Sequence, residues 1–180
     1  MKRIVWLAVA FLLIAPASSA GDAEHPVPSP VDDARFDFLK GLVGTWIGPT
    51  PEDGAPAPVF EFRLTAGGSA IEEHEFLGSP MEMLTVYNME GTDLVATHYC
   101  MMGNQPRAVA AKRVKKNTLS FDCAGKPGNS ASHDDQHVHG WSIRQQEDGT
   151  LHYAAEIVKA GEVAEAPDFV LTRADRMASR

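Results

Sequence analysis

The feature that most constrains the fold is a series of short segments in which apolar and polar residues alternate. Nine such segments follow one another, and turn-forming residues separate them. A period of two is typical of strands that bury one face, whereas an amphipathic helix repeats every 3.6 residues. The segments cover residues 59–66, 69–77, 81–89, 93–102, 108–114, 118–124, 137–146, 151–160 and 168–174.

The links between these segments are mostly short, which favours an antiparallel meander. Closing so many strands into a barrel removes exposed sheet edges. Before the strands, VDDARFDFLKGL predicts a short helix that Asp32 or Asp33 can cap and Gly41 can end. We therefore predict an all-β protein: an antiparallel up-and-down barrel of eight to ten strands, closed at one end by a helix over 32–40, within one domain spanning 32–180.

The first twenty residues have the features of an export signal. Lys2 and Arg3 precede an apolar stretch over 4–15, and small residues end at Ala20. The apolar stretch is too short to span a bilayer comfortably, so no stable membrane insertion is expected after cleavage. We expect cleavage after Ala20, a flexible proline-containing tether over 21–31, and a periplasmic or secreted protein.

The charge of the chain limits its partners. Its formal net charge is −8, and loss of two basic residues with the signal would make it −10. Such an acidic chain has no long-range attraction for nucleic acid or anionic lipid. A small molecule is therefore the expected partner, and the oligomeric state stays open.

Two stretches resemble known proteins. FLKGLVGTWIG resembles the opening of calycin-type barrels, which include lipocalins, fatty-acid-binding proteins and haem-binding nitrobindins, through Gly44-Thr45-Trp46. The resemblance implies a helix that plugs the barrel and a structural lock in which Arg173 stacks over Trp46. YNMEGTDLVATHYCMMGNQPR is similar to a group of exported bacterial proteins of unknown function that share the HYC and GNQPR stretches.

The hairpin over 81–102 supplies the first candidate site. With Gly91-Thr92 as its turn, Thr85 lies opposite His98, and alternation places both on a face rich in sulfur and aromatic groups. This face can be filled core, the wall of a small-molecule pocket, or a copper site of methionine, thiol and imidazole donors. The face comprises Met81, Met83, Thr85, Tyr87, Ala96, His98, Cys100 and Met102.

The turn GNQPR, residues 103–107, supplies further polar groups. Asn104 and Gln105 can bond the backbone of the turn itself. Alternatively, Asn104, Gln105 and Arg107 form the rim of a pocket, where the guanidinium would suit a carboxylate head group.

HDDQHVHGW, residues 133–141, is the second constellation. His137 and His139 lie two apart on a strand, so both can bind one metal ion. The third ligand could come from His133, Asp134, Asp135, His98 or His152, and the metal could activate water. The same histidines could instead line a pocket with Trp141 or face solvent, and the nitrobindin resemblance adds haem ligation.

The remaining reactive groups suggest no catalytic machinery. Residues 72–75 predict an exposed charged strand, although one of its carboxylates could serve as a general base. Cys100 and Cys123 belong to strands with another strand between them. That separation is roughly 9–10 Å, beyond the ~7 Å limit for a disulfide, so free, buried thiols are expected.

The leading hypothesis is an exported barrel that binds a small, partly apolar ligand in its interior and is not an enzyme. The first alternative is a metal- or haem-dependent enzyme using His137 and His139, and the second is a structural or stress-related domain with a filled core. No cofactor is assigned, although haem or a transition metal remains open. The predicted ligand-binding residues are His98, Asn104, Gln105, Arg107, His137, His139 and Trp141.

Overall fold

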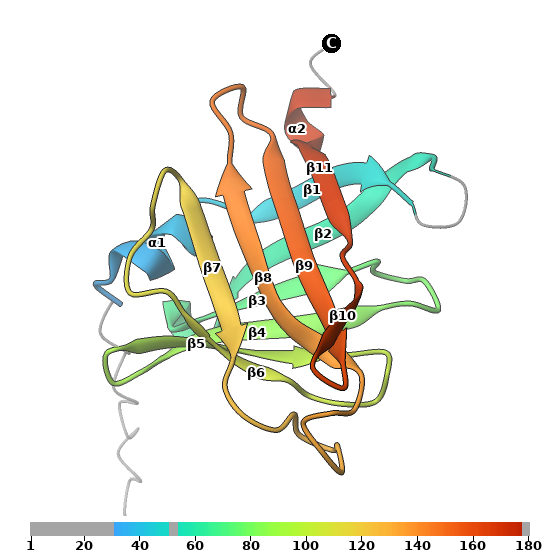
Figure 1. The fold of residues 1–180 in the computed structure, drawn as a ribbon. Coiled ribbons are helices and arrows are strands. Elements are labelled where there is room, and N and C mark those ends of the chain that lie inside the picture. Colours follow the sequence, from blue (N-terminus) through green and yellow to red (C-terminus); the bar gives the residue numbers. More distant parts are fainter. Residues whose placement is uncertain (1–30, 51–53, 178–180) are drawn as a thin grey trace, which may run out of the picture.

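The computed structural model describes residues 31–50 and 54–177, whose strands form one antiparallel sheet (Figure 1). The predicted signal segment and residues 21–30 of the predicted tether lie outside the described residues. The strands are β1 (Gly44–Pro49), β2 (Pro56–Thr65), β3 (Ala70–Glu75), β4 (Met83–Glu90), β5 (Asp93–Tyr99), β6 (Arg107–Ala110), β7 (Thr118–Cys123), β8 (His137–Gln145), β9 (Leu151–Lys159), β10 (Glu162–Glu165) and β11 (Asp168–Arg173). The helices are α1 (Ala34–Lys40) and α2 (Ala174–Met177), with a 3-10 turn over Ala66–Gly68.

Ten of these strands close into a barrel. Around the ring they follow the order β9, β11, β1, β2, β3, β4, β5, β6, β7 and β8, and β8 pairs back with β9. β10 pairs with the end of β9, beside β11. The predicted all-β, up-and-down antiparallel barrel of calycin-like architecture is confirmed.

The nine predicted strands are all present, with ends that differ by a few residues. The largest difference is β6, which ends at Ala110 rather than at Val114. The hairpin register is as predicted, with Met89 opposite Leu94 and Thr85 opposite His98. β10 was not predicted, because all four of its residues are exposed and no alternation marks it.

Helix α1 forms because its ends and its buried face are both encoded locally. The Asp33 carboxylate accepts the backbone N–H groups of Arg35 and Phe36, as an N-cap should. Phe36 and Leu39 are fully buried, and Gly41 follows as the C-cap. The Arg35 guanidinium also donates to the Thr92 carbonyl at 2.8 Å, which ties the helix to the β4–β5 turn.

Trp46 and Arg173 form the lock that the lipocalin resemblance implies. The two residues are partners in the β1–β11 pairing, and the guanidinium carbon lies 5.2 Å from the centroid of the buried indole. Trp46 Nε1 donates to the Leu42 carbonyl at 2.9 Å, and Arg173 donates to the carbonyls of Gly41 and Val43. The lock therefore joins the first and last barrel strands to the end of α1.

Gly44, the glycine of the Gly-x-Trp sequence, is required by this lock. Its φ of +128° is one that other residues rarely adopt, and a Cβ there would lie 3.2 Å from Arg173 Nη2. The positive φ and the close approach of the guanidinium both favour glycine at this position.

Two further structural findings bear on function. Cys100 and Cys123 are free, and β6 separates their strands as predicted; Cys100 is buried but Cys123 is only half-buried. Within residues 31–50 and 54–177, the helices are too short and too polar to cross a membrane.

We predict that Arg173→Ala lowers the free energy of unfolding by roughly 2–3 kcal/mol, because it removes a cation–π contact and hydrogen bonds to two carbonyls. Urea denaturation followed by tryptophan fluorescence measures the change. Arg113→Ala, at an exposed position, is the matched control and should change little. Equal effects of the two substitutions would contradict the lock.

Candidate functional site

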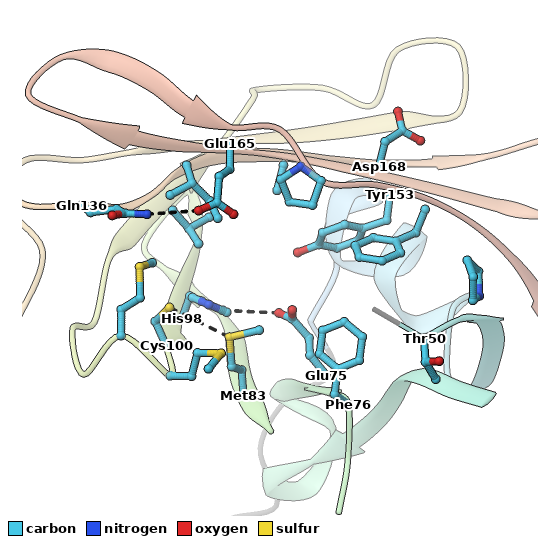
Figure 2. Close-up of a pocket in the computed structure, with 18 residues that line it drawn as sticks. Thr50, Glu75, Phe76, Met83, His98, Cys100, Gln136, Tyr153, Glu165 and Asp168 are labelled. Carbon is cyan, nitrogen blue, oxygen red and sulfur yellow. Dashed lines mark hydrogen bonds and ion pairs between the residues drawn. The ribbon is translucent and has the colours of Figure 1, made fainter. Parts of the chain in front are cut away.

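A cavity of about 640 Å³ opens at the end of the barrel where β1 ends, away from the Trp46 lock (Figure 2). Its walls are mostly apolar and include sulfur atoms, aromatic rings and a few polar groups. The lining residues are Pro49, Thr50, Glu75, Phe76, Met83, His98, Cys100, Met101, Met102, Gln136, Val138, Tyr153, Ala155, Ile157, Glu165, Pro167, Asp168 and Phe169.

Strand β3 brings two carboxyl groups into the barrel. Glu73 is 0% exposed and Glu75 is 6% exposed, whereas Glu72 and His74 on the alternate face are half-buried. The prediction of an exposed charged strand was wrong for Glu73 and Glu75, because β3 lies between β2 and β4 and its inner face is enclosed by the closed sheet. Glu75 reaches the cavity, and Glu73 lies deeper.

Glu73 is held by a chain of hydrogen bonds from aromatic side chains. Tyr87 Oη donates to Glu73 Oε2 at 2.6 Å, and Trp141 Nε1 donates to Tyr87 Oη at 3.2 Å. Tyr87 and Trp141 also pack against Phe121, which fixes both donors in place. These hydrogen bonds run from Trp141 through Tyr87 to Glu73, which forms an acidic pair with Glu75.

The carboxyl groups of Glu73 and Glu75 share an environment that opposes charge. Burial raises the pKa of Glu73 to about 7, while the hydroxyl of Tyr87 lowers it. Burial and the neighbouring Glu73 carboxylate hold the pKa of Glu75 well above its usual value. The pair therefore retains at least one proton at neutral pH, as like charges confined together must.

His98 and Glu75 lie next to each other in the wall of the cavity. Its Nδ1 lies 2.9 Å from Thr85 Oγ1 and 3.4 Å from Glu75 Oε1. Burial lowers the pKa of His98 to about 4, and burial also keeps Glu75 protonated. We therefore interpret the 3.4 Å approach as a contact between two neutral groups and not as an ion pair.

Three buried polar atoms of the acidic pair and His98 have no hydrogen-bond partner within the described residues. They are Glu73 Oε1, Glu75 Oε1 and His98 Nε2. A buried polar atom without a partner costs roughly 1–3 kcal/mol, so native proteins satisfy nearly all of them. Of these residues, Glu75 and His98 line the cavity, which makes them the candidate polar anchors for a ligand.

Sulfur atoms line the cavity beside His98 (Figure 2). Cys100 Sγ lies 3.9 Å from Met83 Sδ, and Met101 and Met102 complete the rim. Burial raises the pKa of the Cys100 thiol, so it is not an activated nucleophile. The face that the sequence predicted as core, pocket or copper site is thus a cavity wall in which His98, Cys100 and Met83 stand side by side.

No protein-family model and no curated protein matches this chain. The site is interpreted from its own geometry.

The turn residues predicted to rim the pocket do not line it. Asn104 is buried and its Nδ2 donates to the Gln136 carbonyl at 2.8 Å, while the backbone of Gln105 pairs with Gly128. Arg107 lies half-exposed and forms an ion pair with Glu90. Asn104 thus positions Gln136, which does reach the cavity.

Of the other predicted residues, His98 lines the cavity, whereas Trp141, His137 and His139 do not. Trp141 points into the barrel but stacks on Phe121, with ring centroids 5.1 Å apart, and does not reach the cavity. His137 and His139 belong to a separate cluster behind the cavity wall. A haem in this cavity would therefore meet His98, and neither His137 nor His139 could ligate it.

Sequence reasoning missed Glu75 and Tyr153 as cavity residues. One signal was available: Ile71, Glu73 and Glu75 share one face of β3, and Ile71 is an apolar residue that belongs inside. Alternation along the strand therefore predicts that Glu73 and Glu75 are buried like Ile71, although the run of charged residues suggests an exposed strand.

The acidic pair predicts an unusual dependence of stability on pH. The folded protein keeps a proton that the unfolded chain releases above its ordinary pKa of 4.5. The free energy of unfolding is therefore greatest below that value and falls as the pH rises through about 7, by at most roughly 1.4 kcal/mol per pH unit per proton. Glu75→Gln should flatten this decline, since an amide has no proton to lose.

Urea denaturation between about pH 5 and pH 8 measures the effect. Glu72→Gln, on the outer face of the same strand, is the matched control and should follow the parent protein. A Glu75→Gln variant with the parent's pH dependence would show that Glu75 is charged at neutral pH.

Proposed function

We propose that this protein binds a small, partly apolar and neutral molecule in the cavity, with a polar group hydrogen-bonded to Glu75 and His98. The observation that carries the proposal is the pair of buried, unpartnered atoms, Glu75 Oε1 and His98 Nε2, beside a cavity of about 640 Å³. Mostly apolar walls with a few fixed polar atoms are typical of small-molecule sites.

The polar groups of the cavity favour a ligand with a hydroxyl group. A hydroxyl both donates and accepts, so it can satisfy a carboxyl oxygen and an imidazole nitrogen together. Among the described lining residues none is lysine or arginine, and Glu75, Glu165 and Asp168 are acidic. An anionic ligand would meet no opposite charge there, so a carboxylate head group held by Arg107 is not part of the proposal.

The cavity also favours a binder over the other two hypotheses. A structural domain with a filled core needs no opening of this size at one end of its barrel. The cavity contains a protonated carboxyl and a neutral imidazole, which could transfer protons, but no activated nucleophile accompanies them among the described residues. Binding is the function that uses every feature of the site.

Export and kinship with calycin-type barrels belong to the same proposal. The lysine-arginine start and apolar run before Ala20 support export to the periplasm or the medium. The Gly44-Thr45-Trp46 sequence and the contact of Trp46 with Arg173 support the kinship. Cell fractionation with N-terminal sequencing tests export, which requires a mature chain beginning at Gly21.

Filling the cavity should abolish binding. Ala155 lines the cavity and Ala154 faces the other side of β9, so Ala155→Phe and Ala154→Phe form a matched pair. The probe is N-phenyl-1-naphthylamine, a neutral apolar amine that fluoresces in apolar surroundings. We expect Ala155→Phe to weaken its binding at least ~10-fold and Ala154→Phe to leave it unchanged.

Circular dichroism of both variants checks that the barrel is intact. Native mass spectrometry of the gently purified parent protein should in addition show a bound neutral organic molecule that Ala155→Phe lacks. Equal probe binding by both folded variants would rule out the cavity as the binding site.

A further inference from the structure

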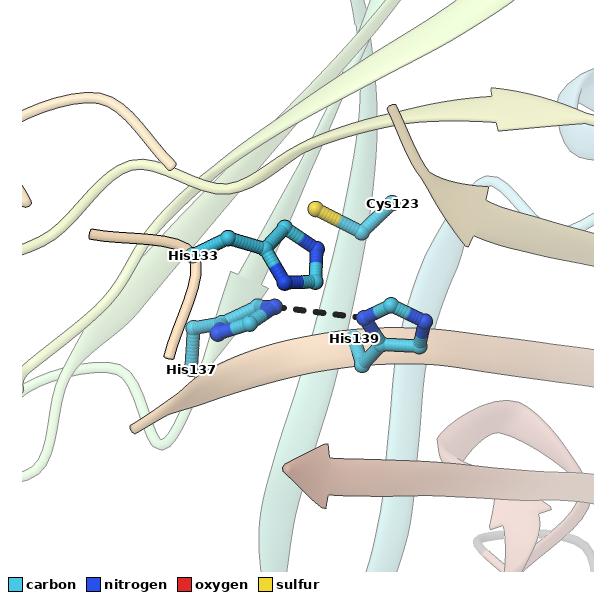
Figure 3. A group of neighbouring side chains, drawn as sticks. All are labelled: Cys123, His133, His137 and His139. Atoms are coloured by element: carbon cyan, nitrogen blue, oxygen red, sulfur yellow. Dashed lines mark hydrogen bonds between the residues drawn. The ribbon is translucent and has the colours of Figure 1, made fainter. Parts of the chain in front are cut away.

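Four metal-binding side chains meet outside the cavity, at the junction of β7, β8 and the loop between them (Figure 3). One donor atom from each lies within 4.8 Å of every other. Figure 3 shows the three imidazole rings facing one another with the thiol beside them. The four side chains are Cys123, His133, His137 and His139.

We propose that this cluster binds one divalent transition metal ion, with zinc as the ion that fits best. Thiolate and imidazole are the donors that zinc prefers, whereas magnesium and calcium require oxygen. Around a tetrahedral zinc ion, bonds of about 2.0–2.3 Å place the donors roughly 3.3–3.7 Å apart. The side chains need to close by about 1 Å, which ring and thiol rotations can supply.

A hydrogen bond already places the His137 imidazole in the form that a metal needs. His137 Nδ1 lies 2.7 Å from the Asp135 carbonyl oxygen, which can only accept, so Nδ1 carries the proton. In the neutral ring, Nε2 therefore presents a lone pair, and it points at His139 Nδ1 at 3.2 Å. Such a carbonyl contact behind a ligating histidine is the usual partner in metal sites.

His137 and His139 lie two residues apart on β8, so strand alternation places both side chains on one face. The pairing of β8 with β9 shifts register between Val138 and Gly140, so His139 is the extra residue of a bulge. Val138 faces the cavity while His137 and His139 face the cluster, with ring centroids 5.4 Å apart, and the extra residue lets Trp141 turn back into the barrel.

The close approach of β8 to β7 at Gly140 brings the thiol near. Gly140 is opposite Asp122, the neighbour of Cys123. A Cβ on Gly140 would lie 3.0 Å from the Phe121 carbonyl oxygen, so any larger residue would push the strands apart. The glycine thus keeps β7 within reach of the histidines.

The loop that carries His133 is shaped without help from a metal. The Asp135 carboxylate accepts the backbone N–H groups of Ala131 and Ser132 at 2.8 and 3.1 Å. The Asp134 carbonyl accepts Ala160 N–H at 2.9 Å, which fastens the loop to the end of β9. His133 is therefore presented to the cluster by a fixed turn, with its ring centroid 4.9 Å from that of His137.

Four protein ligands make a closed site, in contrast to a catalytic zinc, which keeps one position for water. We therefore assign the metal a structural role: it fastens the loop between β7 and β8 to the barrel. Binding displaces the thiol proton of Cys123 to solvent and moves the proton of His139 from Nδ1 to Nε2, so the metal meets one thiolate and three neutral imidazoles. The inference does not depend on whether the cavity holds a ligand.

Cobalt(II) added to chelator-treated, reduced protein tests the site. We expect the visible absorption of tetrahedral cobalt and a near-ultraviolet thiolate-to-cobalt band, both saturating at one ion per chain and both removed by added zinc. Cys123→Ser should lose the thiolate band, and His133→Ala should weaken cobalt binding at least ~10-fold. His133 belongs to the loop, so its replacement leaves the barrel strands unchanged.

Cys100→Ser and His152→Ala are the matched controls, since both residues lie outside the cluster. Both should keep the parent spectrum and affinity. Zinc should also raise the melting temperature of the parent protein by more than that of Cys123→Ser, which keeps three of the four ligands. Absence of a tetrahedral cobalt spectrum in the parent, or its loss in Cys100→Ser but not in Cys123→Ser, would overturn the proposal.

Discussion

The pairing of β8 with β9 is the constraint on which the rest of the structure depends. It closes the sheet, so every strand must send alternate side chains into one enclosed space. At the helix end, that space is filled by rings and packed around Trp46. At the other end the interior opens as the cavity, and Glu73 and Glu75 of β3 are buried beside it. A retained proton and the hydrogen bond from the Tyr87 hydroxyl reduce the cost of burying this pair.

Strand β8 separates the two candidate sites and belongs to both. Val138 faces the cavity, and His137 and His139, on either side of Val138, face the thiol of β7. Gln136, immediately before the strand, also reaches the cavity and is held there by Asn104. A metal that fixed the loop would therefore fix part of the cavity rim as well, which gives the two sites a common wall although their chemistry differs.

Much of the barrel could be predicted because its signals are local. The turn at Gly91-Thr92 sets the register that places Thr85 opposite His98, and a capping carboxylate beside two apolar positions specifies α1. The candidate site was less predictable. The sequence identifies His98 through the face it shares with Thr85. It does not identify Glu75, because the charged run over residues 72–75 is typical of an exposed strand, although alternation places Glu75 on the same face as Ile71. Arg107 was placed at the pocket rim, and its pairing with Glu90 holds it outside.

The sequence by itself determined the period of the strands, the turns between them, the capped helix and the glycine-tryptophan start of the barrel. Each depends on residues that are neighbours along the chain. Only the tertiary structure decided that a carboxyl pair is enclosed, that a bulge at His139 turns Trp141 into the barrel, and that Cys123 joins His133. These outcomes depend on sheet closure and on contacts between segments far apart in sequence, where burial changes the protonation and the partners of a side chain without changing its identity.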